Sequence, residues 1–110
     1  MQGHDMTTIV HPINLLVSDE YDRAAKLHGA VFASPHEGYG VLAEEVQEAG
    51  DSLADMVTAL DTLIRVHRRG EDTGDGLREI YRYALLTAAE CVQVAAVCLK
   101  AAKGGAEHAG

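Results

Sequence analysis

Apolar residues recur every three or four positions along most of the chain, and no segment alternates apolar and polar residues with a period of two. The first spacing is typical of amphipathic helices, and the second would be needed for strands. The pattern therefore predicts an all-α fold, a bundle of about four helices. We expect one domain over residues 1–110, with an N-terminal extension at 1–17 and a flexible tail at 104–110.

The expected helix boundaries come from capping signals. Ser18 precedes an acidic first turn and predicts the start of a helix over residues 18–32. Ser34, Pro35 and Glu37 form a capping-box pattern that starts the next helix. That helix ends before Gly70, after a basic last turn.

Two features of the expected second helix are open. Gly50-Asp51-Ser52 either lies inside one long helix or caps a new one. Gly38 and Gly40 weaken a helix. They are either tolerated without a role or kept because another backbone or a ligand approaches closely.

The last helix is expected from about Leu77 to Lys103, and it carries two apolar stripes. One stripe contains Tyr81, Ala84, Ala88 and Cys91, and the other contains Thr87, Glu90 and Val94. Two stripes predict a helix that is buried on two sides, which a chain of this size achieves most readily as a homo-oligomer, a dimer or larger. Glu90 then lies within apolar surroundings, where a carboxylate must be paired, protonated or bound to a metal.

Charge and cysteine usage narrow the function class. The formal net charge is −8 and no basic block exists, so no nucleic-acid partner is expected. Cys91 and Cys98 are too far apart on one helix for a mutual disulfide, so we expect buried free thiols in a cytoplasmic protein. Glu90 and Gln93 near the middle of the longest apolar run make it a poor membrane span, so no membrane partner is expected.

Carboxylates on two expected helices form the candidate site. In "LAEEVQEA", Glu45 lies at the edge of the apolar stripe and Glu48 lies just outside it, whereas Glu44 points away. With Glu90 they could converge on a hard cation such as Mg²⁺, which prefers oxygen ligands. The alternatives are that Glu45 and Glu48 are surface carboxylates and that Glu90 is neutralised by Arg82 or Tyr39.

The segments "SPHEGYGVLAEEVQEA" and "AAECVQVAAVCLKA" resemble short phage and bacterial MazG-like proteins, members of the all-α nucleoside triphosphate pyrophosphatases. The resemblance covers residues 34–49 and 84–102, and "EEVQE" with "ECVQ" is similar to the family signature EExxE…ExxD. It implies Mg²⁺-dependent hydrolysis of a nucleotide to a monophosphate and pyrophosphate. Glu45, Glu48 and Glu90 match metal ligands, and Gln93 stands where the family has Asp.

An amide oxygen binds Mg²⁺ without charge, so Gln93 is expected as a weaker or more distant ligand. The spacing from Glu48 to Glu90 is longer than in the family, and a straight hairpin turning between Gly70 and Gly76 would separate them by about 12 Å along its axis. Phosphate-neutralising cations are expected from Arg82 and Lys100, with Arg65 and Arg68 as further choices. The alternative function is a non-catalytic helical oligomerisation or binding protein with a degenerate metal site.

Other site chemistries lack their signatures. No Glu-x-x-His pair of the di-iron type, no ordered Ser-His-Asp set and no P-loop occurs in the sequence.

Overall fold

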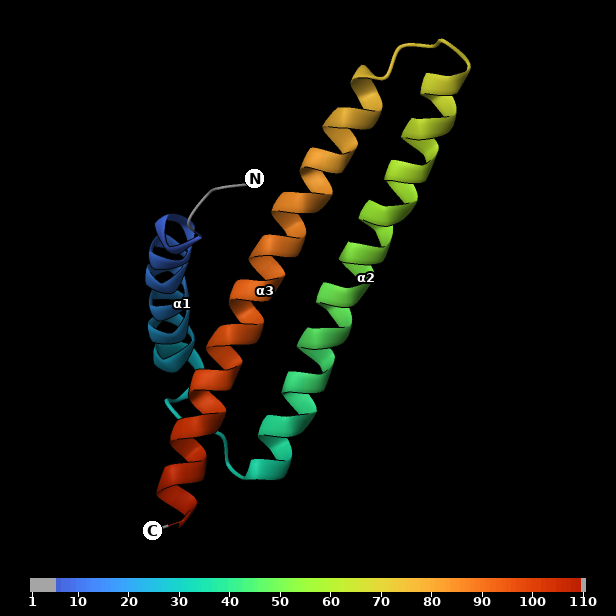
Figure 1. Ribbon diagram of the computed structural model, residues 1–110. Helices are drawn as coiled ribbons and strands as arrows, with labels where there is room; N and C mark the ends of the chain where they lie inside the picture. The colour runs from blue at the N-terminus through green and yellow to red at the C-terminus, as the bar shows by residue number, and fades with distance from the viewer. Residues whose placement is uncertain (1–5, 110) are drawn as a thin grey trace. The chain divides into compact units, whose positions relative to one another are not determined.

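The computed structural model describes residues 6–109, without the side chains of Thr7 and 105–109. Within that range it contains three helices, α1 (Thr7–His28), α2 (Pro35–Arg68) and α3 (Gly74–Ala109), and no strand (Figure 1). The all-α class is thus confirmed, with three helices where about four were expected. The number is lower because no helix ends at Gly50. Helix α2 passes through Gly50-Asp51-Ser52 without a break.

The chain divides into two compact units. Unit 1 comprises Met1–Ala43 and Val92–Gly110, and unit 2 comprises Glu44–Cys91. Helices α2 and α3 each continue from one unit into the other, so unit 2 is a helical hairpin closed by the connection at residues 69–73.

Helix α1 begins at Thr7 and includes Pro12, so most of the expected extension at 1–17 is helical and Ser18 caps nothing. It ends at His28 because Gly29 adopts a positive φ of 91°, and the Gly29 N–H donates to Ala25 O. At the other end of the chain, α3 runs to Ala109 and therefore into the expected tail.

The start of α2 shows half of the predicted capping box, because the Ser34 hydroxyl caps the Glu37 N–H but the Glu37 carboxylate reaches back to Ala33, one residue before the cap. The Glu37 N–H donates to Ser34 Oγ at 3.1 Å, and Glu37 Oε1 accepts from the Ala33 N–H at 3.5 Å. The end of α2 is a Schellman motif, in which the Glu71 N–H donates to Val66 O and the Gly70 N–H to His67 O. Gly70 has a positive φ of 73°, which explains its position after the basic last turn.

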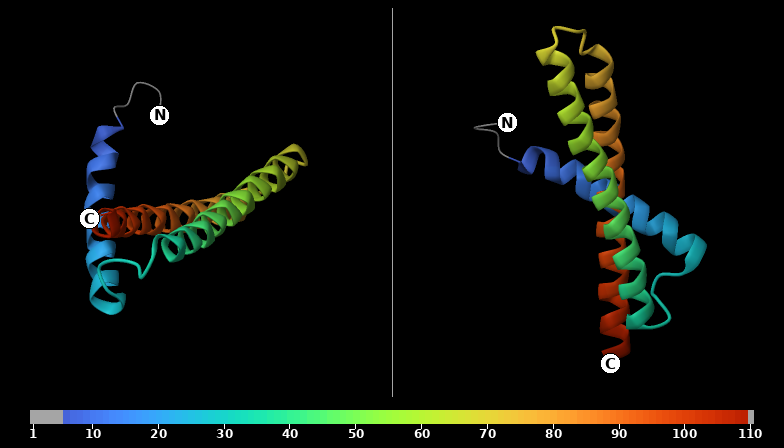
Figure 2. Two further views of the ribbon diagram at one scale, coloured as in Figure 1. Left: turned by 90° about the horizontal axis from the view of Figure 1, so that it is seen from below. Right: turned by 90° about the vertical axis from the view of Figure 1, so that its right-hand side faces the viewer.

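Unit 1 holds its small core between α1 and the C-terminal part of α3, which cross steeply (Figure 2). Val17, Tyr21 and Ala96 are buried there, with Val92 and Ala95 packed against them. Tyr21 donates its hydroxyl proton to Ala30 O at 2.9 Å.

Phe32 of unit 1 is also buried, and its ring packs against the start of α2. A Cβ on Gly38 would lie 3.0 Å from the Phe32 ring, so a side chain's close approach explains the glycine at position 38. Nothing lies within 4 Å of a Cβ placed on Gly40, which is therefore a tolerated glycine.

Candidate functional site

The helices of unit 2 meet along a seam with heptad spacing. On α2 the buried or half-buried positions recur at alternating intervals of four and three residues, and the same is true of α3. This is the spacing of a coiled-coil contact. The seam residues of α2 are Glu45, Ala49, Ser52, Met56, Ala59, Leu63 and Val66, and those of α3 are Gly76, Ile80, Tyr83, Thr87 and Glu90.

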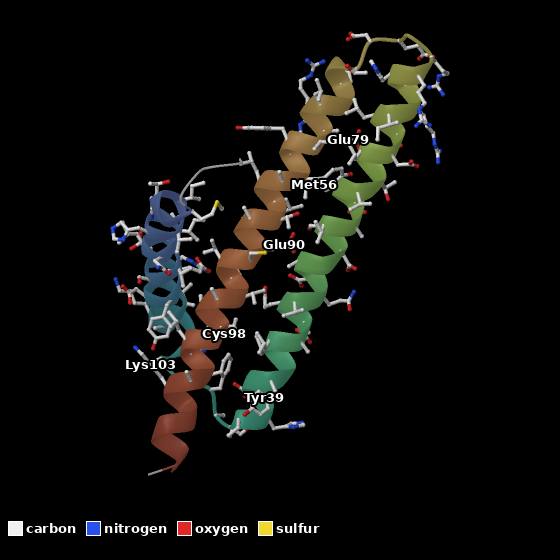
Figure 3. All side chains as sticks on the ribbon, viewed as in Figure 1. Tyr39, Met56, Glu79, Glu90, Cys98 and Lys103 are labelled. Atoms are coloured by element: carbon white, nitrogen blue, oxygen red, sulfur yellow. The ribbon has the colours of Figure 1, made fainter. Side chains whose placement is uncertain are left out.

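Two contacts show how α2 and α3 face each other in unit 2. The Ser52 hydroxyl donates to the Glu90 carboxylate, and a Cβ on Gly76 would lie 2.8 Å from Leu63 Cδ1. Met56 and Glu90 lie between the two helices in Figure 3. The seam is therefore partly polar, with Ser52 against Glu90 and Gly76 against Leu63.

Glu90 is half-buried at the centre of this site, and its partner is neither Arg82 nor Tyr39, the two expected alternatives. The partner is Ser52, which is 6% exposed. A hydroxyl donor replaces part of the hydration that the carboxylate loses inside the seam. Sequence reasoning considered Ser52 only as a possible helix cap. The signal that would have found it is the heptad spacing that Ser52 shares with Glu45, Met56 and Ala59.

The other expected metal ligands are spread over both units. Glu45 is half-buried on the α2 seam, and Glu48 is exposed on the turn of α2 that precedes Ser52. These exposures agree with the edge and outside positions expected from the helical pattern. Gln93 is exposed and belongs to unit 1.

The contact between Ser52 and Glu90 changes the expected geometry of the hairpin. Glu90 lies level with Ser52, which is four residues after Glu48, so the axial separation of Glu48 and Glu90 is about 6 Å instead of about 12 Å. Among the described side chains, those of residue 6 and residues 8–104, however, no three of His, Cys, Asp or Glu are grouped so that they could hold one metal ion. Glu90 is brought to α2, but the three carboxylates do not form a cluster.

The two expected phosphate-binding cations lie in different environments. Arg82 is exposed and lines a shallow hollow on unit 2 with Asp75, Arg78, Glu79 and Tyr83. Lys100 belongs to unit 1, where its ammonium lies 4.3 Å from the centre of the Phe32 ring. Arg82 is thus available to an anionic ligand, whereas Lys100 is engaged in a cation–π contact.

Both thiols depart from the expected burial. Cys91 and Cys98 are free, as expected, but both are exposed. The α3 stripe that contains them also exposes Leu77 and Tyr81, so α3 is covered on fewer sides than its composition suggests. By length and composition, Gly74–Gly104 of α3 is apolar enough to cross a membrane, although little of it is buried in this structure.

Comparison of the chain with models of protein families, with curated proteins and with solved structures finds no match.

Proposed function

We propose that the chain is a MazG-like, Mg²⁺-dependent nucleotide pyrophosphohydrolase, which converts a nucleoside triphosphate to a monophosphate and pyrophosphate. The observation that carries the proposal is the Glu90 carboxylate inside the seam of unit 2, where it accepts from Ser52. An apolar residue would pack there at lower cost. A carboxylate at this position, on the same hairpin as "EEVQE", supports a ligand-binding role.

The donor chemistry of unit 2 fits Mg²⁺, because Glu45, Glu48 and Glu90 supply carboxylate oxygens. Their present arrangement does not provide a three-carboxylate cage. Magnesium is usually held by one or two carboxylates, waters and the phosphates of the substrate. Glu90 with Glu48 or Glu45 would hold it in that manner, with Gln93 as a weaker partner. When bound, the ion neutralises phosphate charge during hydrolysis.

Positively charged side chains complete the proposed site. Arg82 is exposed on α3 of unit 2 and would contact the nucleotide phosphates, for which a guanidinium is well suited. Lys100 was expected to share this role, and it would have to leave the Phe32 ring to do so. We propose a cytoplasmic location, because the two exposed free thiols suit a reducing compartment.

The test is a screen of ribo- and deoxyribonucleoside triphosphates with Mg²⁺, in which pyrophosphate release is measured. We expect release by the wild type, loss of release in Glu90→Gln, and no change in Glu71→Gln, which alters an exposed carboxylate in the connection between α2 and α3. Glutamine keeps an acceptor for Ser52, so circular dichroism should show Glu90→Gln folded. Gln93→Asp should tighten Mg²⁺ binding. Absence of release from every nucleotide by the wild type contradicts the proposal.

A second candidate is a non-catalytic helical oligomerisation or binding protein with a degenerate metal site. Two observations favour it: the lack of a grouped three-carboxylate site among the side chains that the structure describes, and Gln93 in place of the acidic residue. It predicts a wild-type protein that associates but whose melting temperature does not respond to Mg²⁺.

A further inference from the structure

Two lysines of α3 lie over two buried aromatic rings of unit 1. The Lys103 ammonium is 4.2 Å from the centre of the Tyr21 ring, and the Lys100 ammonium is 4.3 Å from the centre of the Phe32 ring. Tyr21 is 8% exposed and Phe32 is 7% exposed, so each lysine covers a residue of the core. The third and last lysine of the chain, Lys26, is exposed on α1.

Both rings hold the connection between α1 and α2, residues 29–34. Phe32 is part of this connection, and the Tyr21 hydroxyl donates to Ala30 O at 2.9 Å. Gly104 of α3 is buried beside the connection, since a Cβ on this glycine would lie 3.8 Å from the Phe32 nitrogen. The same short stretch of α3 thus contacts the connection through its backbone and through two lysine side chains.

Ordinary roles of a helical lysine do not account for Lys100 and Lys103. Neither forms an ion pair with a carboxylate of the described residues. Both precede the last turn of α3, which runs to Ala109, and the attraction of a cation to a helix C-terminus falls off within that turn. The aromatic rings are therefore their partners in unit 1.

The core of unit 1 is too small to make these contacts redundant. Among the described residues of this unit, the buried apolar side chains are Val17, Tyr21, Phe32 and Ala96. One cation–π contact at an exposed site changes an equilibrium by a factor of about two to five. Two such contacts together favour the closed connection by roughly five- to thirtyfold.

Both contacts depend on the positive charge of the ammonium group. The face of an aromatic ring carries negative partial charge and attracts a cation. Acylation converts the ammonium to a neutral amide, which removes this attraction and adds bulk at the ring. Lys103 is exposed and Lys100 is half-buried, so a small reagent in water reaches both.

We propose that Lys100 and Lys103 form a latch that holds the α1–α2 connection against α3, and that acylation of their Nζ atoms opens it. The acyl donor is of the acyl phosphate class. The deprotonated Nζ attacks the carbonyl carbon and an N–C bond forms, while the C–O bond to the phosphate breaks and its electron pair leaves with the phosphate. The amine proton passes to water.

The effect of acylation is confined to one part of the chain. All three lysines belong to unit 1, and residues 44–91 of unit 2 contain none. The contacts that align α2 with α3 in unit 2 involve no lysine, because they join Ser52 with Glu90 and Leu63 with Gly76. Opening of the latch therefore loosens the connection and leaves the hairpin intact.

The test is backbone hydrogen exchange of the full chain, measured by mass spectrometry. Lys100→Gln/Lys103→Gln imitates the acylated state and should speed exchange in residues 17–34 by about five- to thirtyfold, without a change in residues 53–66. Lys100→Arg/Lys103→Arg keeps a cation over each ring and should exchange like the wild type. Lys26→Gln removes the same charge outside the latch and should speed exchange by about twofold at most.

Acetyl phosphate tests the reaction itself. After treatment of the wild type, peptide mapping should find acetyl groups on Lys100 and Lys103, and residues 17–34 should exchange as fast as in the double glutamine variant. The same treatment of Lys100→Arg/Lys103→Arg still acetylates Lys26 and should leave the exchange of residues 17–34 unchanged.

Equal exchange in Lys100→Gln/Lys103→Gln and in the wild type overturns the proposal, as does acetylation of Lys26 alone. Equal exchange in the double glutamine and double arginine variants overturns it too, because charge would then play no role. If the double glutamine variant fails to fold by circular dichroism, Lys103→Gln replaces it, with exchange about two- to fivefold faster than in the wild type. None of these measurements depends on nucleotide hydrolysis, so the proposal fails or stands separately from the enzymatic one.

Discussion

The hydrogen bond between Ser52 and Glu90 gives the most direct test of unit 2. Ser52→Ala removes the hydroxyl that donates to this half-buried carboxylate, without adding volume. Loss of a hydrogen bond to a charged group costs about 1.5–3 kcal/mol when the group stays buried. Because Glu90 is half-buried and can recover some water, we expect the lower part of this range, about 1.5 kcal/mol.

For a chain of this length, 1 kcal/mol at the melting temperature corresponds to a shift of roughly 4–8 °C. We therefore expect Ser52→Ala to melt about 6–12 °C below the wild type. The assay is thermal and urea unfolding followed by helical circular dichroism, at one fixed protein concentration because association would shift both transitions.

The control is Thr62→Ala, which removes an exposed hydroxyl from the same helix. It should change the free energy of unfolding by less than about 0.5 kcal/mol. A double-mutant cycle with Glu90→Ala, which removes the acceptor, should give a coupling energy of about 0.5–3 kcal/mol. If Ser52→Ala is as stable as Thr62→Ala, or if the coupling energy is zero, then Ser52 does not support Glu90 and the account of the seam is wrong.

Three further predictions concern unit 1. Gly38→Ala should lower the free energy of unfolding by about 1 kcal/mol, because its Cβ would crowd the Phe32 ring. Gly40→Ala should raise the free energy of unfolding by about 0.5–1 kcal/mol in the same urea titration, because alanine favours a helix more than glycine does. Equal shifts in the two variants would refute the packing argument. Tyr21→Phe should cost about 1 kcal/mol in thermal unfolding, because Ala30 O loses its donor, and an unchanged melting temperature would count against that bond. The hydrogen bond from Arg23 lowers the pKa of Glu20 from its ordinary value. Glu20 therefore contributes stability above the unfolded-state pKa and loses it as the pH falls through the lower folded-state pKa. Glu20→Gln should therefore be less stable than the wild type at pH 7 and equal to it at about pH 2, and a difference that persists in acid would contradict the assignment.

Local signals predicted both ends of α2, because each of these ends depends on a few adjacent residues, whereas the expected ends of α1 and α3 differ from Thr7–His28 and Gly74–Ala109. Ser34 and Glu37 start α2, and Gly70 closes it with the expected positive φ. The start of α1 was predicted wrongly because Ser18 and the acidic residues after it give a capping signal, whereas α1 begins at Thr7 and passes through Ser18. A capping signal at Ser18 therefore does not stop the helix from extending toward the N-terminus.

The site was only partly predictable, because periodicity gives the direction of a side chain and not what covers it. Glu45 and Glu48 have the expected exposures. The donor to Glu90 depends on how α2 and α3 face each other, and helical pattern alone does not determine that. For the same reason Cys91 was expected inside and lies outside.

The polar pair in the seam has a consequence for how the hairpin chooses its alignment. A heptad seam repeats every seven residues, so α3 could slide along α2 by one repeat and still place seam positions against seam positions. Such a slip would move Glu90 from Ser52 to Ala59, which offers no donor, or to Glu45, which carries the same charge. Either mismatch leaves a half-buried carboxylate uncompensated. Ser52 and Glu90 therefore select one alignment among several that the apolar residues alone would tolerate, much as a single buried asparagine does in a coiled coil.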